Sequence, residues 1–136
     1  KHEDYQIDVE CEEFILVHMD VRLIIQVLVN LIDNAIKYTL PGSKICIRGI
    51  KKDGKAQISV ADNGPGISDE VKPHIFEMFY TGNNTIADSH RSLGLGLSLC
   101  RSIIEAHGGT LVLTDNIPRG CMFTFTLPLS EVILNE

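Results

Sequence analysis

The sequence predicts an α+β fold, a two-layer α/β sandwich in which helices cover one face of a mixed sheet. Apolar side chains recur at helical spacing in residues 20–38 and 98–107, which indicates two long helices. Six short stretches have the composition or the alternation that is typical of strands. They are arranged as two strands, a helix, a hairpin, a short helix, a long loop, a helix and two strands. This order favours one sheet with its helices on one side.

The length and composition indicate a single domain that spans residues 1–136. The hydrophobic fraction of 44% suits a globular protein, and the formal net charge of -6 argues against a nucleic-acid-binding surface. No stretch has the length and apolarity of a membrane span, and no signal peptide opens the chain. The four cysteines form no C-x-x-C pair, so we expect reduced thiols of a cytosolic protein. Because the chain starts abruptly in a strand-like stretch, we expect a fragment of a longer protein.

The first part of the chain contains two expected strands and the longest expected helix. Residues 5–10 alternate between polar and apolar side chains, and residues 14–18 are predicted to form a second, short strand. Asp20 is a good N-cap for the helix of residues 20–38, and the Pro-Gly pair that follows stops it. Its apolar side chains cover so much of the circumference that we expect the helix to be mostly buried.

The polar side of this helix differs from an ordinary solvated face. Asn30 and Asn34 stand one turn apart in it, although asparagine is a poor helix former. An amide side chain is neutral and offers both donors and an acceptor, so it can contact a metal ion or a phosphate without adding charge. We therefore interpret this face as one wall of a pocket, against the commoner alternative of a solvated helix face.

A buried acid is expected at the end of a central hairpin. Its strands are predicted at residues 45–50 and 56–62, with a short basic turn between them. The period of two in the second strand places Asp62 on the same face as Ile58 and Val60. A carboxylate on the core face at the end of a strand is expected at the floor of a pocket. The D-x-G-x-G pattern that starts there is, by itself, equally typical of a simple turn.

The second half of the chain contains a helix that begins after glycines. Pro73 keeps a first helix short, and residues 81–93 lack periodicity, as in a lid or a disordered segment. Residues 94–97 read G-L-G-L and precede the helix of residues 98–107, where exposed backbone N–H groups can contact an anion. Neither G-x-x-x-x-G-K-[ST] nor a complete G-x-G-x-x-G is present. Two strands close the predicted sheet, at residues 110–113 and 122–127.

Four motifs in this order resemble those of sensor histidine kinases. They are an asparagine box at residues 30–39, a first glycine box at 62–67, a phenylalanine box at 76–79 and a second glycine box at 94–97. The resemblance covers about residues 14–128. It implies the Bergerat ATP-binding fold of gyrase, Hsp90 and MutL ATPases, in which the mixed sheet is mostly antiparallel. Residues 79–84 and 92–100 resemble the Kdp potassium-responsive sensor kinases in particular.

The resemblance implies a protein histidine kinase of two-component signal transduction. Such a domain binds ATP with Mg2+ and transfers the γ-phosphoryl group to a histidine on a separate dimerisation domain. That domain is not in this sequence, so the expected partners are this domain and a response regulator. Neither nucleic acid nor direct membrane contact is expected. The full-length protein is expected to be a membrane-anchored homodimer, and this chain a cytoplasmic domain of a bacterial inner-membrane sensor kinase.

The resemblance also implies roles for single residues. Asn34 is expected to bind Mg2+, Asn30 to contact phosphate or metal-bound water, and Lys37 to contact phosphate, and these three are the expected catalytic residues. Tyr38 is expected to stack on or flank the adenine, and Asp62 to accept a hydrogen bond from its amino group. The other expected nucleotide contacts are Gly64, Gly66, Ile67, Arg91, Leu93, Gly94, Leu95, Gly96 and Leu97.

The segment around the second glycine box departs from the family pattern at two positions. Ser92 stands where relatives carry a glycine, and Thr81 where they often carry a basic residue. Both departures concern the lid and its phosphate contacts rather than ATP binding itself. Phe76 and Phe79 are expected to anchor this lid.

Three alternatives remain at this point. A free-standing serine kinase of the anti-sigma type has this fold at nearly this length, although the phenylalanine box favours the histidine kinase. A gyrase-type ATPase would carry a glutamate base one turn before the metal asparagine, where this chain has Asn30. The third alternative is a non-catalytic docking module gated by nucleotide.

Overall fold

The computed structural model describes residues 5–11, 15–37, 39–77 and 96–130. Its five strands form one sheet in the order β1-β2-β3-β5-β4. The first pair, β1 and β2, is parallel, and the other three pairs are antiparallel. The strands are β1 (Gln6–Cys11), β2 (Lys44–Lys52), β3 (Lys55–Asp62), β4 (Leu111–Asp115) and β5 (Cys121–Pro128).

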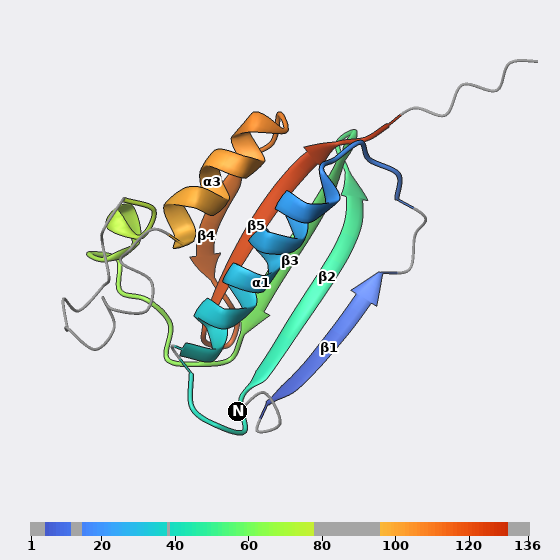
Figure 1. Cartoon of the computed structure of the whole chain (residues 1–136). Coiled ribbons are helices and arrows are strands. Elements are labelled where there is room, and N and C mark those ends of the chain that lie inside the picture. Colours follow the sequence, from blue (N-terminus) through green and yellow to red (C-terminus); the bar gives the residue numbers. More distant parts are fainter. Residues whose placement is uncertain (1–4, 12–14, 38, 78–95, 131–136) are drawn as a thin grey trace, which may run out of the picture.

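Two helices, α1 (Val21–Lys37) and α3 (Gly96–Ala106), lie side by side across one face of this sheet (Figure 1). A short 3-10 helix, η2 (Lys72–His74), lies between β3 and α3 in the sequence. The predicted mixed, mostly antiparallel sheet with helices on one face is therefore confirmed. None of the helices in the described ranges is long and apolar enough to cross a membrane.

Helix α1 is capped as the sequence predicts. Asp20 Oδ1 accepts hydrogen bonds from the backbone N–H groups of Arg22 at 3.1 Å and Leu23 at 3.3 Å. These bonds satisfy two of the donors that a helix start leaves unpaired.

The burial of α1 is narrower than its apolar composition predicts. Ile24, Val27, Leu31 and Ala35 are buried. Ile25 and Val29, however, keep 53% and 48% of their surface exposed, so the expectation of a mostly buried helix is wrong for this flank. The reason is that the sheet lies beneath α1 and α3 lies on one side of it, so one side of α1 still faces outward.

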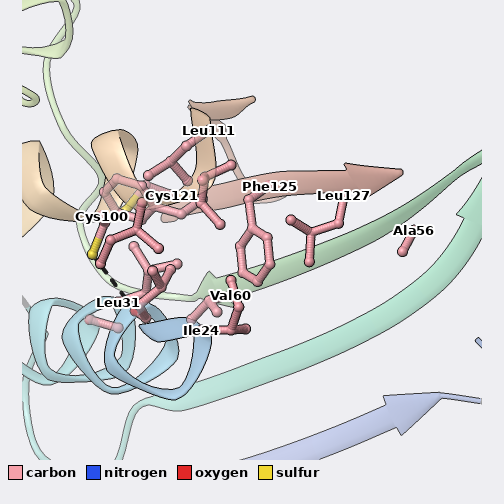
Figure 2. Close-up of a cluster of buried hydrophobic side chains, with 14 of the residues drawn as sticks. Ile24, Leu31, Ala56, Val60, Cys100, Leu111, Cys121, Phe125 and Leu127 are labelled. Atoms are coloured by element: carbon pink, nitrogen blue, oxygen red, sulfur yellow. Dashed lines mark hydrogen bonds between the residues drawn. The ribbon is translucent and has the colours of Figure 1, made fainter. Parts of the chain in front are cut away.

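The core lies between the two helices and the sheet. Phe123, Phe125 and Leu127 alternate along β5 and point into it, and Val60 of β3 and Leu31 of α1 meet them there (Figure 2). Burial of such side chains contributes roughly 1.5–3 kcal/mol each relative to exposure. The neighbouring strands β3 and β5 therefore contribute a large part of the buried core of the described residues.

The predicted strand at residues 14–18 is not a strand in its described part, residues 15–18. This segment carries the chain from the end of β1 at the sheet edge to the start of α1 in the helical layer, so it cannot follow a neighbouring strand. It is held by a hydrogen bond of 2.7 Å from the backbone N–H of Ser130 to the carbonyl of Leu16. Ile15 and Val17 still pack against the core, although the segment pairs with no strand of the described sheet.

The region after β3 is close to the prediction. Ser68 accepts a hydrogen bond from the backbone N–H of Val71 at 3.3 Å, and a short 3-10 helix follows instead of an α-helix. Helix α3 begins at Gly96, two residues earlier than predicted, and ends before Gly108, whose φ is +83°. The predicted lid at residues 81–93 lies outside the described residues.

Candidate functional site

The predicted site residues come from three elements whose ends lie near one another. These are the C-terminal half of α1, the C-terminal end of β3 and the N-terminal end of α3 (Figure 1). Helices α1 and α3 pack so closely that the Asn30 side chain of α1 hydrogen-bonds the thiol of Cys100 on α3. Burial raises the pKa of that thiol to about 11, and the bond with Asn30 offsets part of the rise. The thiol also contacts the carbonyl of Val27 at 3.8 Å (Figure 2).

Asp62 is the one described carboxylate in the buried set, with 4% of its surface exposed. Its Oδ1 accepts hydrogen bonds from the backbone N–H of Gly64 at 2.9 Å and of Cys121 at 3.4 Å. Its Oδ2 accepts a bond from the Cys121 thiol at 3.1 Å. These donors compensate for the loss of water around a buried acid. The predicted inward register of Asp62 is confirmed.

Gly64 lies against the end of α1 through Thr39. A Cβ atom on Gly64 would stand 2.5 Å from Cγ2 of Thr39 and 3.2 Å from Oδ1 of Asp62, so no larger residue fits without a shift. Thr39 is itself buried, and its hydroxyl donates a hydrogen bond of 2.8 Å to the carbonyl of Ala35. The first glycine box and the asparagine box are thus joined by one threonine side chain.

The turn between β4 and β5 closes on the backbone that follows β3. Asn116 Nδ2 donates to the carbonyl of Asp62 at 2.7 Å, and Arg119 Nε donates to the carbonyl of Asn63 at 3.1 Å. Gly120 approaches so closely that a Cβ atom there would collide with the Asp62 carbonyl oxygen. This turn therefore holds the backbone that carries the acid.

Two residues, Lys72 and Phe76, tie the segment that follows β3 to the sheet and to α3. Lys72 forms ion pairs with Asp69 at 2.7 Å and with Asp115 at 2.6 Å. Phe76 packs edge-to-face on Phe123, with ring centroids 6.0 Å apart, and the Arg101 guanidinium lies 4.9 Å from its ring. Phe76 is thus anchored to the core and to α3.

The structure brings together only part of the predicted set. Asn30, Asn34 and Lys37 are partly buried residues of α1, and Gly96 and Leu97 form the first turn of α3. The side chains of Ile67 and Leu97 pack against the core. Several predicted residues lie outside the described ranges, namely Tyr38, Phe79, Arg91, Leu93, Gly94 and Leu95.

Three residues that support Asp62 received no role from the sequence. Thr39 ends the asparagine box, and Asn116 and Cys121 flank the turn that contains Gly120. The only local signal was at Cys121, which follows a glycine at the start of a strand. The signal was too weak because each of the three acts on a partner distant in the sequence.

The donor set determines which metal these residues could bind. The described residues contain no group of three His, Cys, Asp or Glu side chains that could hold a metal ion. Any cation bound near Asn34 would therefore rely on amide oxygen, water and ligand phosphates. Mg2+ is commonly bound in this way, because it keeps several waters and takes few protein ligands.

Comparisons with known proteins agree with this arrangement. The family described as histidine kinase-, DNA gyrase B-, and HSP90-like ATPase matches residues 19–131. The sensor protein KdpD of Clostridium acetobutylicum is 43% identical over 117 residues, which are 86% of this chain and 13% of that protein. The adaptive-response sensory kinase SasA of Crocosphaera subtropica is 45% identical over 115 residues, which are 83% of this chain and 29% of that protein. The chain thus spans less than a third of these curated relatives.

Two solved structures of a histidine kinase have a similar fold. The catalytic domain of histidine kinase ThkA aligns with a TM-score of 0.79 at 37% identity, over 92% of this chain and 79% of that one. A second structure holds ThkA in complex with the response regulator protein TrrA and aligns with a TM-score of 0.74 at 36% identity, over 93% of this chain and 35% of that one.

Proposed function

The chain belongs to the family of histidine kinase-, DNA gyrase B- and HSP90-like ATPases, and from that premise we propose that it binds ATP with Mg2+ and supplies the γ-phosphoryl group to a histidine on a separate dimerisation domain. The observation that carries the proposal is the buried carboxylate of Asp62 at the end of β3. It lies next to a glycine that permits close approach and at the same end of the sheet as the two asparagines of α1.

Asp62 is suited to recognise an adenine amino group. A carboxylate offers about four acceptor positions, and the described donors use two on Oδ1 and one on Oδ2. One acceptor position on Oδ2 therefore remains for a donor from a ligand. An exocyclic amino group is such a donor, whereas the carbonyl of an oxopurine is not.

We assign Asn34, Asn30 and Lys37 to the phosphate end of the nucleotide. Asn34 would hold Mg2+ through its amide oxygen, and Asn30 would contact phosphate or metal-bound water. Lys37 ends α1 and would contact phosphate as a point charge. Mg2+ held there would neutralise charge on the phosphates, and positioning by these residues would supply much of the remaining catalysis of phosphoryl transfer. The N-terminal end of α3, where backbone N–H groups can contact an anion, supports this assignment.

The proposed partners are a helical dimerisation domain that carries the phosphorylated histidine and a response regulator. The solved complex of ThkA with TrrA supports the second partner, since ThkA is similar to this chain. The likeness to KdpD, named a sensor protein, supports placement in a longer sensor. We infer that this longer protein is a membrane-anchored bacterial homodimer with this domain in the cytoplasm. Fractionation and cross-linking of the full-length gene product would test that inference.

Nucleotide binding is tested by calorimetry with ADP and Mg2+. We expect Asn34→Ala and Asp62→Ala each to abolish measurable binding, because the first removes the metal ligand and the second removes the acceptor for the base. Ser102→Ala, an exposed position on α3, serves as the matched control and should bind as the parent does. Unchanged affinity in both site variants would refute the assignment.

Phosphoryl transfer is tested by adding a histidine-bearing dimerisation domain to the chain with labelled ATP. Label should appear on that domain in an acid-labile form, and the Asn34→Ala chain should transfer none. Transfer to a serine-bearing antagonist protein instead would favour the anti-sigma type. Binding of the dimerisation domain without transfer would favour a docking module.

A further inference from the structure

We propose that Cys121 is a positioning residue for base recognition, whose thiol keeps the Asp62 carboxylate oriented so that the site selects an aminopurine over an oxopurine. This inference rests on the proposed function, since it concerns how the same carboxylate discriminates between bases. Cys121 is the first residue of β5, and both its backbone N–H and its thiol contact Asp62.

The two contacts of Cys121 divide the carboxylate between its oxygens. The backbone N–H binds Oδ1, which the Gly64 N–H also binds, and the thiol binds Oδ2 at 3.1 Å. Two donors on one oxygen and one on the other fix the rotation of the carboxylate about its Cβ–Cγ bond. The remaining acceptor position on Oδ2 then has a defined direction.

The thiol is available as a donor because it stays protonated. Burial raises the pKa of Cys121 well above its usual range, and the hydrogen bond and the negative charge of Asp62 raise it further. Cys121 keeps only 4% of its surface exposed, so water does not replace it easily. A protonated thiol that faces a carboxylate oxygen can donate a hydrogen bond to it, as the Cys121 thiol does to Oδ2 of Asp62.

The direction of the remaining acceptor position on Oδ2 decides which base Asp62 can bind. A carboxylate oxygen accepts hydrogen bonds, so it pairs with the amino group of adenine. The carbonyl oxygen of hypoxanthine is itself an acceptor, so it forms no hydrogen bond at that position. Loss of the thiol should therefore both weaken adenine binding and relax discrimination against the oxopurine.

The test compares ADP with inosine diphosphate, each with Mg2+, by calorimetry on the full chain. In Cys121→Ala we expect ADP affinity to fall roughly three- to tenfold at neutral pH, the usual effect of losing one hydrogen bond. The ratio of ADP to inosine diphosphate affinity should also fall, because the carbonyl of inosine diphosphate does not use the acceptor position on Oδ2. Cys121→Ser, which keeps a hydroxyl donor, should retain the parental ratio.

Two controls separate positioning from packing. Cys46→Ala removes a thiol from β2, the neighbour of β3, but Cys46 pairs with Ala61 and therefore lies on the opposite face of the sheet from Asp62, so the affinity ratio should stay unchanged. Asn116→Ala removes a bond to the Asp62 carbonyl rather than to its carboxylate, so it should weaken both nucleotides alike. Thermal unfolding verifies that every variant is folded.

The outcomes distinguish this inference from the proposed function. If the parent chain binds neither nucleotide, or both equally, the proposed function fails. If the parent discriminates and Cys121→Ala keeps the same ratio of affinities, the role of Cys121 is overturned. An equal loss of ratio in Cys121→Ser and Cys121→Ala would also overturn it, because the donor would then not be the cause.

Discussion

At the scale of single residues, the candidate site depends on contacts between positions that are distant in the sequence. Asp62 is held by Gly64 from its own loop but also by Cys121 from β5. The space for a side chain at Gly64 is in turn limited by Thr39, which follows the end of α1. The site is therefore sensitive to small changes of volume as well as to loss of its charged or polar groups.

Gly64→Ala should destabilise the fold and weaken nucleotide binding together. The added methyl group would stand 2.5 Å from Cγ2 of Thr39, and overpacking of this kind costs about 1–3 kcal/mol. Denaturant unfolding and ADP calorimetry would measure the two losses. The matched rescue is Thr39→Ser, which removes the Cγ2 methyl group but keeps the hydroxyl bond to Ala35. A double variant no more stable than Gly64→Ala alone would contradict the proposed steric cause.

The sequence predicted the residues that act through local spacing and missed those that act across the fold. Alternation along β3 was enough to place Asp62 inward, because Ile58 and Val60 share its face. No local pattern could show that Cys121 would contact Asp62, since 59 positions separate them. The same holds for the bond from Asn116, which depends on the pairing of β3 with β5.

At the scale of elements, the two helices are joined at the end opposite the candidate site as well as near it. His107, just after α3, accepts a hydrogen bond on Nε2 from the backbone N–H of Asp20 at 3.0 Å. Its Nδ1 lies 2.8 Å from the carbonyl of Ile103. Asp20 also caps α1, so one short region fixes the end of α3 to the beginning of α1.

These contacts predict one tautomer for His107. Because Nε2 accepts a hydrogen bond, the proton of the neutral ring must be on Nδ1, where it is donated to the Ile103 carbonyl. Nitrogen NMR of the ring at neutral pH should show this tautomer. His107→Ala should lower the free energy of unfolding by about 1–2 kcal/mol, whereas His18→Ala, at an exposed position, should change it by less than about 0.5 kcal/mol. A ring protonated on Nε2 would contradict the assignment.

Element type and order were mostly predictable, and the one wrong strand has a physical explanation. The hairpin, both helices and the two closing strands follow from periodicity and from turn residues such as Gly54 and Gly108. Residues 15–18 alternate in burial without pairing, because a connection between two layers can also bury every second side chain. The exposure of Ile25 and Val29 could not be foreseen, since it depends on where α3 lies.

At the scale of the whole molecule, the stability should depend on pH through a buried thiol. Burial raises the pKa of Cys100 from 9.0 to about 11 in the folded chain. Between these values the unfolded chain loses the proton while the folded chain keeps it, so the folded state binds more protons. Its stability is then complete below about pH 9 and decreases as the pH rises toward 11.

The parent chain should therefore lose stability more steeply above pH 9 than Cys100→Ser does. A two-unit difference in pKa corresponds to about 2–3 kcal/mol at the high end of this range. Denaturant unfolding at intervals between pH 8 and about 11 would measure both slopes, and other titrating groups cancel in the comparison. Parallel curves for the two proteins would show that Cys100 is not the source of the dependence.

The hydrogen bonds around Asp62 join β3, β5 and the turn after β4 without any ligand. The part of the candidate site around Asp62 is thus preorganised. The carboxylate that would accept a hydrogen bond from a purine is already fixed in its orientation. Few side-chain rotations would therefore be lost when the base binds, and the entropic cost of that contact would be small. Asp62 thus differs from a carboxylate on the surface, whose side chain would have to be ordered when the ligand binds.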